Sequence, residues 1–176
     1  MLLVDYFKGQ RFELRSPLSP EDFKATIEPH AGSIFWPFKE GIVGGVYWGR
    51  LRLSYHGSPL FDYNAKPTLS GPITGSGKGS YGYLSYRAPT WAIAFFGFWY
   101  LMMVLMVSVL AVIVMTDNGG GELAAIPFFT LILVILAIVP IGMHRLGTRD
   151  SENELKAIFD FLTKQTDASI TPATKV

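Results

Sequence analysis

The chain of 176 residues contains no cysteine. Disulfide bonds, thiolate catalysis and cysteine-ligated metals are therefore excluded. Histidine is scarce as well: His30, His56 and His144 lie far apart in the sequence, and none has a second histidine one helical turn away. We therefore expect neither a metal site nor a cofactor, and we assign no catalytic residue. The absence of cysteine does not distinguish one cellular compartment from another.

Charge is absent from two long apolar segments, residues 91–115 and 123–143. About 20 apolar residues, rising 1.5 Å each in a helix, span the hydrocarbon core of a bilayer. Between the segments lie Asp117, three glycines and Glu122, a sequence too polar and too flexible to continue a helix through a membrane. The sequence predicts a transmembrane helical hairpin over residues 91–143.

A cleavable signal peptide is not evident, because Asp5 interrupts the short apolar start of the chain. Arg87 precedes the first apolar segment and Arg145 follows the second, whereas the loop of residues 116–122 is acidic. Positively charged flanks stay in the cytosol. We therefore expect a multi-pass membrane protein with both termini in the cytosol and loop 116–122 outside.

Residues 1–90 predict a small cytosolic domain of the α+β class. Apolar and charged residues alternate over residues 11–15, which is typical of a half-exposed strand. Ser19 followed by Pro20 indicates the start of a short helix. Residues 42–87 return to the alternation of strands. The expected order of elements in this domain is β-α-β-β-β.

A second helix is predicted within residues 144–165. Ser151 and Glu154 have the spacing of a capping box, and an apolar stripe follows, made of Leu155, Ile158, Phe159 and Leu162. The polar face of this helix is mostly acidic, which suits an anionic membrane surface poorly. We therefore expect the stripe to dock on the sheet and complete the soluble domain, and we expect residues 166–176 to form a disordered tail.

Two short motifs invite a catalytic interpretation. The glycine-rich run of residues 75–80 lacks the phosphate-loop pattern, because Pro72 and Gly79 occupy the positions that require glycine and serine or threonine. We interpret it as a hairpin turn. His56 and Asp62 are placed to meet across a hairpin as base and orienting group, but no nucleophile elbow accompanies them. We interpret these two as polar residues beside a turn.

The apolar segments offer two sets of candidate contact residues. Aromatic side chains crowd the start of the first segment: Trp91, Phe95, Trp99 and Tyr100. They predict an interfacial belt, with a lipid- or partner-binding groove as the alternative. Small or polar residues form a seam for helix packing: Ala94, Gly97, Ser108 and Ala111 on the first segment, Thr130 and Ala137 on the second. We expect these two faces to meet, because small residues let helices approach closely in lipid.

The layout resembles a group of small uncharacterised bacterial membrane proteins with two transmembrane helices and an N-terminal α+β domain. The residues that carry the resemblance are Leu-Ser-Pro-Glu-Asp at 18–22, the helix at 155–162, and the strand residues Phe61, Lys66, Pro67, Leu69, Gly71 and Ile73. The resemblance implies a location in the cell inner membrane. It implies no activity, because that group has none to transfer.

These observations favour a non-enzymatic integral membrane protein that serves as a membrane-anchored scaffold or regulatory module. The alternatives are an oligomeric pore or membrane-perturbing protein, and an enzyme acting on lipid headgroups. The absence of ionisable residues inside the apolar segments argues against a pump. The expected partners are the lipid bilayer and another membrane protein or a second copy of the chain. Residues 1–90 carry ten Lys or Arg against seven Asp or Glu, too small an excess to predict nucleic-acid binding.

Overall fold

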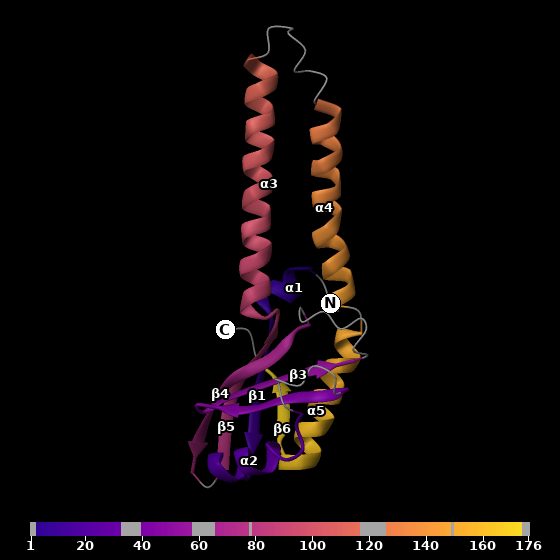
Figure 1. Ribbon diagram of the computed structural model, residues 1–176. Coiled ribbons are helices and arrows are strands. Elements are labelled where there is room, and N and C mark those ends of the chain that lie inside the picture. Colours follow the sequence, from indigo (N-terminus) through magenta and orange to yellow (C-terminus); the bar gives the residue numbers. More distant parts are fainter. Residues whose placement is uncertain are drawn as a thin grey trace. The chain divides into compact units, whose positions relative to one another are not determined.

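The computed structural model in Figure 1 describes residues 3–32, 40–57, 66–77, 79–116, 126–148 and 150–173. Over these residues the fold is α+β, with five helices and one antiparallel six-stranded sheet. The chain forms two compact units. The sheet unit consists of Met1–Pro89 together with Gly147–Val176, and the helical unit is Thr90–Leu146.

The sheet unit contains six strands and three helices among the described residues. In chain order they are α1 (Leu3–Lys8), β1 (Gln10–Ser16), α2 (Pro20–Ile27), β2 (Gly41–Tyr47), β3 (Arg50–His56), β4 (Thr68–Ser76), β5 (Gly79–Arg87), α5 (Ser151–Thr166) and β6 (Ser169–Pro172). The strands are ordered β2-β3-β4-β5-β1-β6 across the sheet. The strands from β2 to β5 form a meander, and β1 adds to β5 on its far side.

Helix α2 begins where the sequence predicts it. The Ser19 hydroxyl accepts a hydrogen bond from the backbone N–H of Asp22 at 3.1 Å and donates one to the Asp22 carboxylate at 2.8 Å. Pro20 occupies the first helical position, where its missing N–H has no consequence. Phe23 and Ile27, one turn apart, are both fully buried, so this helix is fixed to the sheet by one face.

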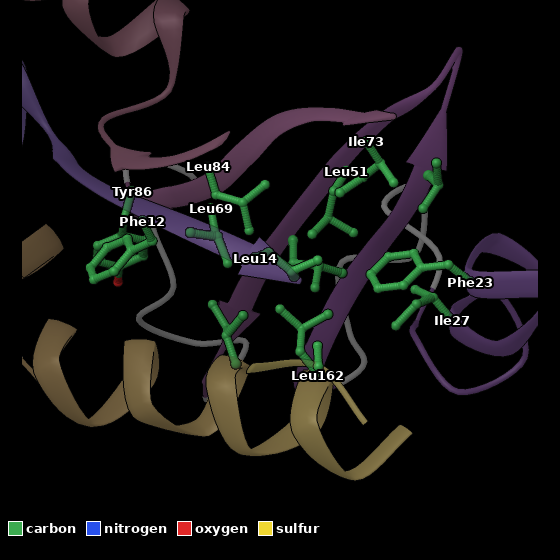
Figure 2. Packing of buried hydrophobic residues seen from close by; sticks show 14 residues of the cluster. Phe12, Leu14, Phe23, Ile27, Leu51, Leu69, Ile73, Leu84, Tyr86 and Leu162 are labelled. Atoms are coloured by element: carbon green, nitrogen blue, oxygen red, sulfur yellow. The ribbon is translucent and has the colours of Figure 1, made fainter. Parts of the chain in front are cut away.

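The core lies between the sheet and the helices α2 and α5. Figure 2 shows Phe23 and Ile27 of α2 and Leu162 of α5 among the side chains that the strands contribute. Ile158 and Leu162 are fully buried, and the other residues of the predicted α5 stripe pack against the same cluster. The predicted docking of this helix on the sheet is therefore confirmed. Burial of each large apolar side chain contributes about 1.5–3 kcal/mol.

The start of α5 differs from the prediction. The residue before the helix is Asp150, which has a positive φ of 62° and makes no side-chain cap. Ser151 and Glu154 do not form a capping box around a Ser151 cap; both are buried. The Glu154 carboxylate lies 2.6 Å from the Lys66 ammonium, and the Tyr86 hydroxyl donates to the Ser151 carbonyl at 3.1 Å. Tertiary partners therefore replace the local motif.

The prediction of a disordered tail over residues 166–176 is wrong for its described part. β6 pairs antiparallel with β1, with Ile170 opposite Leu14 and Thr171 opposite Glu13. A strand this short has too few residues to show alternation, and it is held by the ladder of its neighbour and by Ile170 against the core. Residues 174–176 lie outside the described residues.

The helical unit contains α3 (Thr90–Thr116) and α4 (Ile126–Thr148). In the described part of the chain one helix is long and apolar enough to cross a membrane, with a candidate span at Thr90–Ile113. The apolar stretch of α4, Phe129–Val139, is shorter. At 1.5 Å per residue it rises about 17 Å, against about 30 Å for a hydrocarbon core.

This finding overturns the predicted multi-pass topology, in which both termini lie in the cytosol and loop 116–122 lies outside. The prediction counted residues 123–143 as one continuous span. In the structure α4 is described from Ile126 to Thr148, and the apolar stretch found within its described residues is Phe129–Val139, so α4 is not a second candidate span. Residues 117–125 lie outside the described residues.

Candidate functional site

The aromatic residues at the start of α3 differ in exposure and in what they contact. Trp91 and Tyr100 are exposed. Phe95 is half-buried, with its ring centroid 5.5 Å from that of Trp99. The Trp99 indole N–H donates a hydrogen bond to the backbone carbonyl of Leu136 at 3.0 Å. Trp99 therefore joins α3 to α4, whereas Trp91 and Tyr100 are available for an outside contact.

The predicted small-residue seam is not the face that joins the two helices over the described residues. Ala94, Gly97, Ser108, Ala111 and Thr130 are exposed, and Ala137 is half-buried. A Cβ added to Gly97 would meet nothing within 4 Å. The half-buried stripes consist of larger residues: Trp99, Met103, Met106, Leu110 and Ile113 on α3, and Ile132, Leu133 and Leu136 on α4.

An apolar pocket of about 250 Å³ opens within the helical unit. Its lining consists of Met102, Leu105, Met106, Val109, Leu110 and Ile113 of α3 and Phe129 of α4. The sequence signal for it was the methionine-rich run, because methionine fills irregular gaps. The pocket is smaller than ordinary ligand sites, which hold about 300–1,000 Å³. It suits a hydrocarbon chain and contains no group for acid or base catalysis.

Neither of the two motifs that invited a catalytic interpretation forms a catalytic site in the described residues. Asp62, the expected partner of His56, lies outside the described residues. His30 is exposed, and its Nδ1 lies 3.0 Å from the Thr26 carbonyl. Within the described ranges no group of three or more His, Asp or Glu side chains is placed to hold a metal ion. The glycine-rich run joins β4 directly to β5, so the prediction of a hairpin turn there is confirmed.

The outward face of the sheet carries an uneven distribution of charge. Both α2 and α5 pack on the opposite face, where their buried residues belong to one core cluster. The outward positions alternate with buried ones along the strands and include five exposed arginines: Arg11, Arg15, Arg50, Arg52 and Arg87. Glu13 is the only acidic residue in the six strands. We call these five arginines and the residues between them the basic face.

Strand register arranges part of the basic face in one row. Arg52 pairs with Ser70, Ser70 with Ser85, and Ser85 with Arg11. Neighbouring strands lie about 4.8 Å apart, so the two arginine Cα atoms are separated by about 14 Å. The two serines between them are short. The row therefore offers two guanidinium groups over a low, hydroxyl-lined strip.

The guanidinium groups of the basic face are mostly unpaired. Arg15 lies 3.7 Å from the Glu13 carboxylate and 5.6 Å from the centroid of the Tyr81 ring. The other four arginines have no carboxylate within 4.0 Å in the described part of the chain. Acidic residues gather on the helices of the sheet unit instead: Glu21 and Asp22 on α2, and Glu152, Glu154 and Asp160 on α5. Lys24, Lys156 and Lys164 lie on the same two helices, so α2 and α5 together carry a net charge of −2, against +4 for the five arginines and Glu13 of the strands.

An exposed tryptophan stands at the turn between β2 and β3. Trp48 is 100 % exposed and has a positive φ of 49°, followed by Gly49 at 70°. Two positive φ angles define a type I′ hairpin turn, which Asn-Gly or Gly-Gly forms without strain. A bulky residue in this conformation is an outlier, and such strain concentrates at functional sites. Trp48 directly follows the exposed Tyr47 and lies two residues before Arg50 of the basic face.

A polar recess of about 470 Å³ lies at the end of β1, β4 and β5. It is lined by Arg15, Ser16, Ser76, Gly79, Ser80, Tyr81 and Tyr83. The Ser80 hydroxyl is buried without a hydrogen-bond partner among the described residues. Desolvation raises the pKa of Tyr81, and the hydrogen bond with Tyr83 and the negative charge of Glu13 raise it further. The recess is a neutral to basic extension of the basic face.

No protein family, curated protein or solved structure matches the chain. The resemblance to small bacterial membrane proteins therefore gains no support from these comparisons. The same holds for a bacterial origin and for the cell inner membrane.

Proposed function

We propose that the chain is a non-enzymatic, membrane-anchored module, with the sheet unit as its binding or regulatory domain and the helical unit, which begins with α3, as its attachment to the bilayer. The observation that carries this proposal is the candidate span Thr90–Ile113, of which only 6 % is buried within the chain. Apolar surface in water costs about 25 cal/mol per Å². A helix apolar on every side therefore needs a cover, and lipid is the cover that its length suits.

The character of the exposed polar groups supports binding over catalysis. The basic face presents guanidinium groups and hydroxyls spread over a sheet, whereas enzyme sites converge several groups in one concave pocket. A water-filled pore would need a polar strip along α3. Ser108 lies in the middle of that helix, and its hydroxyl donates at 2.8 Å to the Val104 carbonyl of the preceding turn. Its donor is thus not directed to a water-filled path.

The test is membrane extraction of the full chain. We expect wild-type protein to stay with membranes after alkaline carbonate washing and to be released by detergent. A variant with Val104→Asp and Val107→Asp places two charges at exposed positions of α3 and should be released, because a charge inside the hydrocarbon core is strongly unfavourable. Val104→Leu with Val107→Leu is the matched control and should remain bound. Wild-type chain recovered as a soluble oligomer would contradict the proposal, because another copy would then cover α3.

A further inference from the structure

We propose that the basic face of the sheet unit binds the anionic headgroups of phospholipids, with Trp48 entering the interface beside them. This inference rests on the proposed membrane attachment, which supplies the lipid surface. It adds that the sheet unit has its own lipid-binding surface and that this surface selects anionic lipid.

Charge separation gives the sheet unit a defined orientation toward a negative surface. The basic face carries five arginines and one acid, while α2 and α5 on the opposite side of the core carry five acids and three lysines. A negative surface attracts the first side and repels the second, so one orientation is favoured. A net charge of +1 for the whole chain hides this asymmetry.

The type of basic residue favours phosphate as the ligand group. The lysines of the described sheet unit lie outside the strands, as Lys24, Lys156 and Lys164 do on its helices, whereas the strands contain five arginines and no lysine. Arginine binds phosphate through two parallel N–H···O bonds and loses hydration more readily than lysine. The row from Arg52 to Arg11 places two such groups over Ser70 and Ser85, whose hydroxyls can donate to the same oxygens.

Trp48 distinguishes a lipid surface from other anionic partners. Tryptophan and tyrosine prefer the headgroup level of a bilayer, where the ring is apolar and the N–H or O–H remains hydrated. The turn between β2, which is an edge strand of the sheet, and β3 presents the exposed Trp48 and Tyr47 beside Arg50 of the basic face. An aromatic tip beside arginines suits insertion into an anionic interface. Because α3 is itself a candidate membrane helix, lipid is favoured over RNA, which could also use arginines and tyrosines.

The experiment uses the full chain in nanodiscs of phosphatidylcholine, with a Thr74→Cys substitution labelled by an environment-sensitive dye. Thr74 is an exposed outward residue of β4, and the absence of native cysteine makes the label specific. Vesicles with 30 % phosphatidylglycerol are then added, or the same lipid is included in the discs. We expect a blue shift with phosphatidylglycerol and none with pure phosphatidylcholine.

Two pairs of substitutions distinguish binding by the basic face from a general effect of net charge. Arg11→Gln with Arg52→Gln should raise the vesicle concentration that gives a half-maximal blue shift about thirty-fold, because each lost charge should weaken binding about five-fold. The matched control, Lys156→Gln with Lys164→Gln, removes the same charge from α5 and should change it less than three-fold. Trp48→Ser should weaken binding equally at low and high salt, whereas the arginine effect should vanish at about 1 M salt.

The failures of the two proposals are distinguishable. A chain that does not enter nanodiscs contradicts the membrane attachment. A chain that enters them but gives no shift with phosphatidylglycerol, in the discs or in vesicles, overturns the headgroup inference alone. Equal loss in the arginine and lysine pairs would also overturn it. A shift produced by single-stranded RNA at lower concentration than by vesicles would assign the basic face to nucleic acid instead.

Discussion

Leu162 of α5 is fully buried, whereas Leu101 of α3 is 56 % exposed, although both are leucines within long helices. α5 confines its apolar residues to one stripe, and that stripe contacts the sheet. α3 is apolar on all sides, so no single partner within the chain covers it. The arrangement of apolar residues around a helix, more than their number, therefore determines whether the chain buries the helix itself.

Truncation after Gly147 should have the largest effect on the stability of the sheet unit. It removes α5 and β6, so the core loses Ile158 and Leu162 and β1 loses a neighbour. We expect the remaining sheet unit to unfold and become sensitive to protease under conditions in which the full chain is resistant, while α3 keeps its helical signal in circular dichroism. A protease-resistant fragment of unchanged size would show that residues 3–89 fold without the C-terminal segment.

Loss of the ion pair between Lys66 and Glu154, which joins the two sequence segments of the sheet unit, should have the next largest effect on its stability. The side chains of Lys66 and Glu154 are 16 % and 7 % exposed. Lys66→Met leaves the Glu154 carboxylate buried without this partner and should cost about 3–5 kcal/mol of unfolding free energy, measured by urea denaturation. Adding Glu154→Leu should recover most of it. Lys24→Met, which breaks an exposed pair with Glu28, should cost less than about 1 kcal/mol.

The comparison of the two leucines can be measured directly. Leu162→Ala should lower the unfolding free energy of the sheet unit by about 2–5 kcal/mol, since it leaves a cavity in the core. Leu101→Ala removes the same atoms from an exposed position of α3 and should leave the urea midpoint of the sheet unit unchanged. Equal losses in the two variants would mean that the units do not unfold independently.

Alkaline pH should have the smallest effect on the stability of the sheet unit. Burial raises the pKa of Tyr6 to about 12, and burial followed by the charge of Glu154 raises the pKa of Tyr86. Unfolded tyrosine ionises near pH 10, so the unfolded state releases its protons first. Stability should fall as the pH rises from about 10 through about 12. Tyr6→Phe should make this fall shallower in thermal melts, and an unchanged slope would exclude Tyr6 as a cause.

Local signals in the sequence predicted local structure well. The Ser19 cap and the α5 stripe each depend on residues within two turns of one another, and the structure confirms both. The pairing of β6 with β1 and the bond between Lys66 and Glu154 join residues far apart in the chain. Sequence periodicity does not reveal such long-range contacts. The sequence therefore predicted disorder for the residues of β6 and a capping box for Glu154.

The candidate site shows the same limit. The alternation of Arg50 and Arg52 with Leu51 and Leu53 was visible in the sequence. Which arginines share an open face depends on the strand order and on both helices packing on one side. Composition predicted two long apolar segments, but in the described residues only α3 is a candidate membrane span.

The sheet unit is assembled from segments on either side of residues 90–146, and this sets an order of events during synthesis. Strands β1 to β5 leave the ribosome first, but α5 and β6 follow only after the whole helical unit has been translated. At about 5–20 residues per second, the nascent sheet waits for seconds without the part of its core that α5 supplies, although α2 has already been translated. α3 and α4 are therefore translated before the core can be completed, and chaperones have a defined interval in which to hold the unfinished sheet.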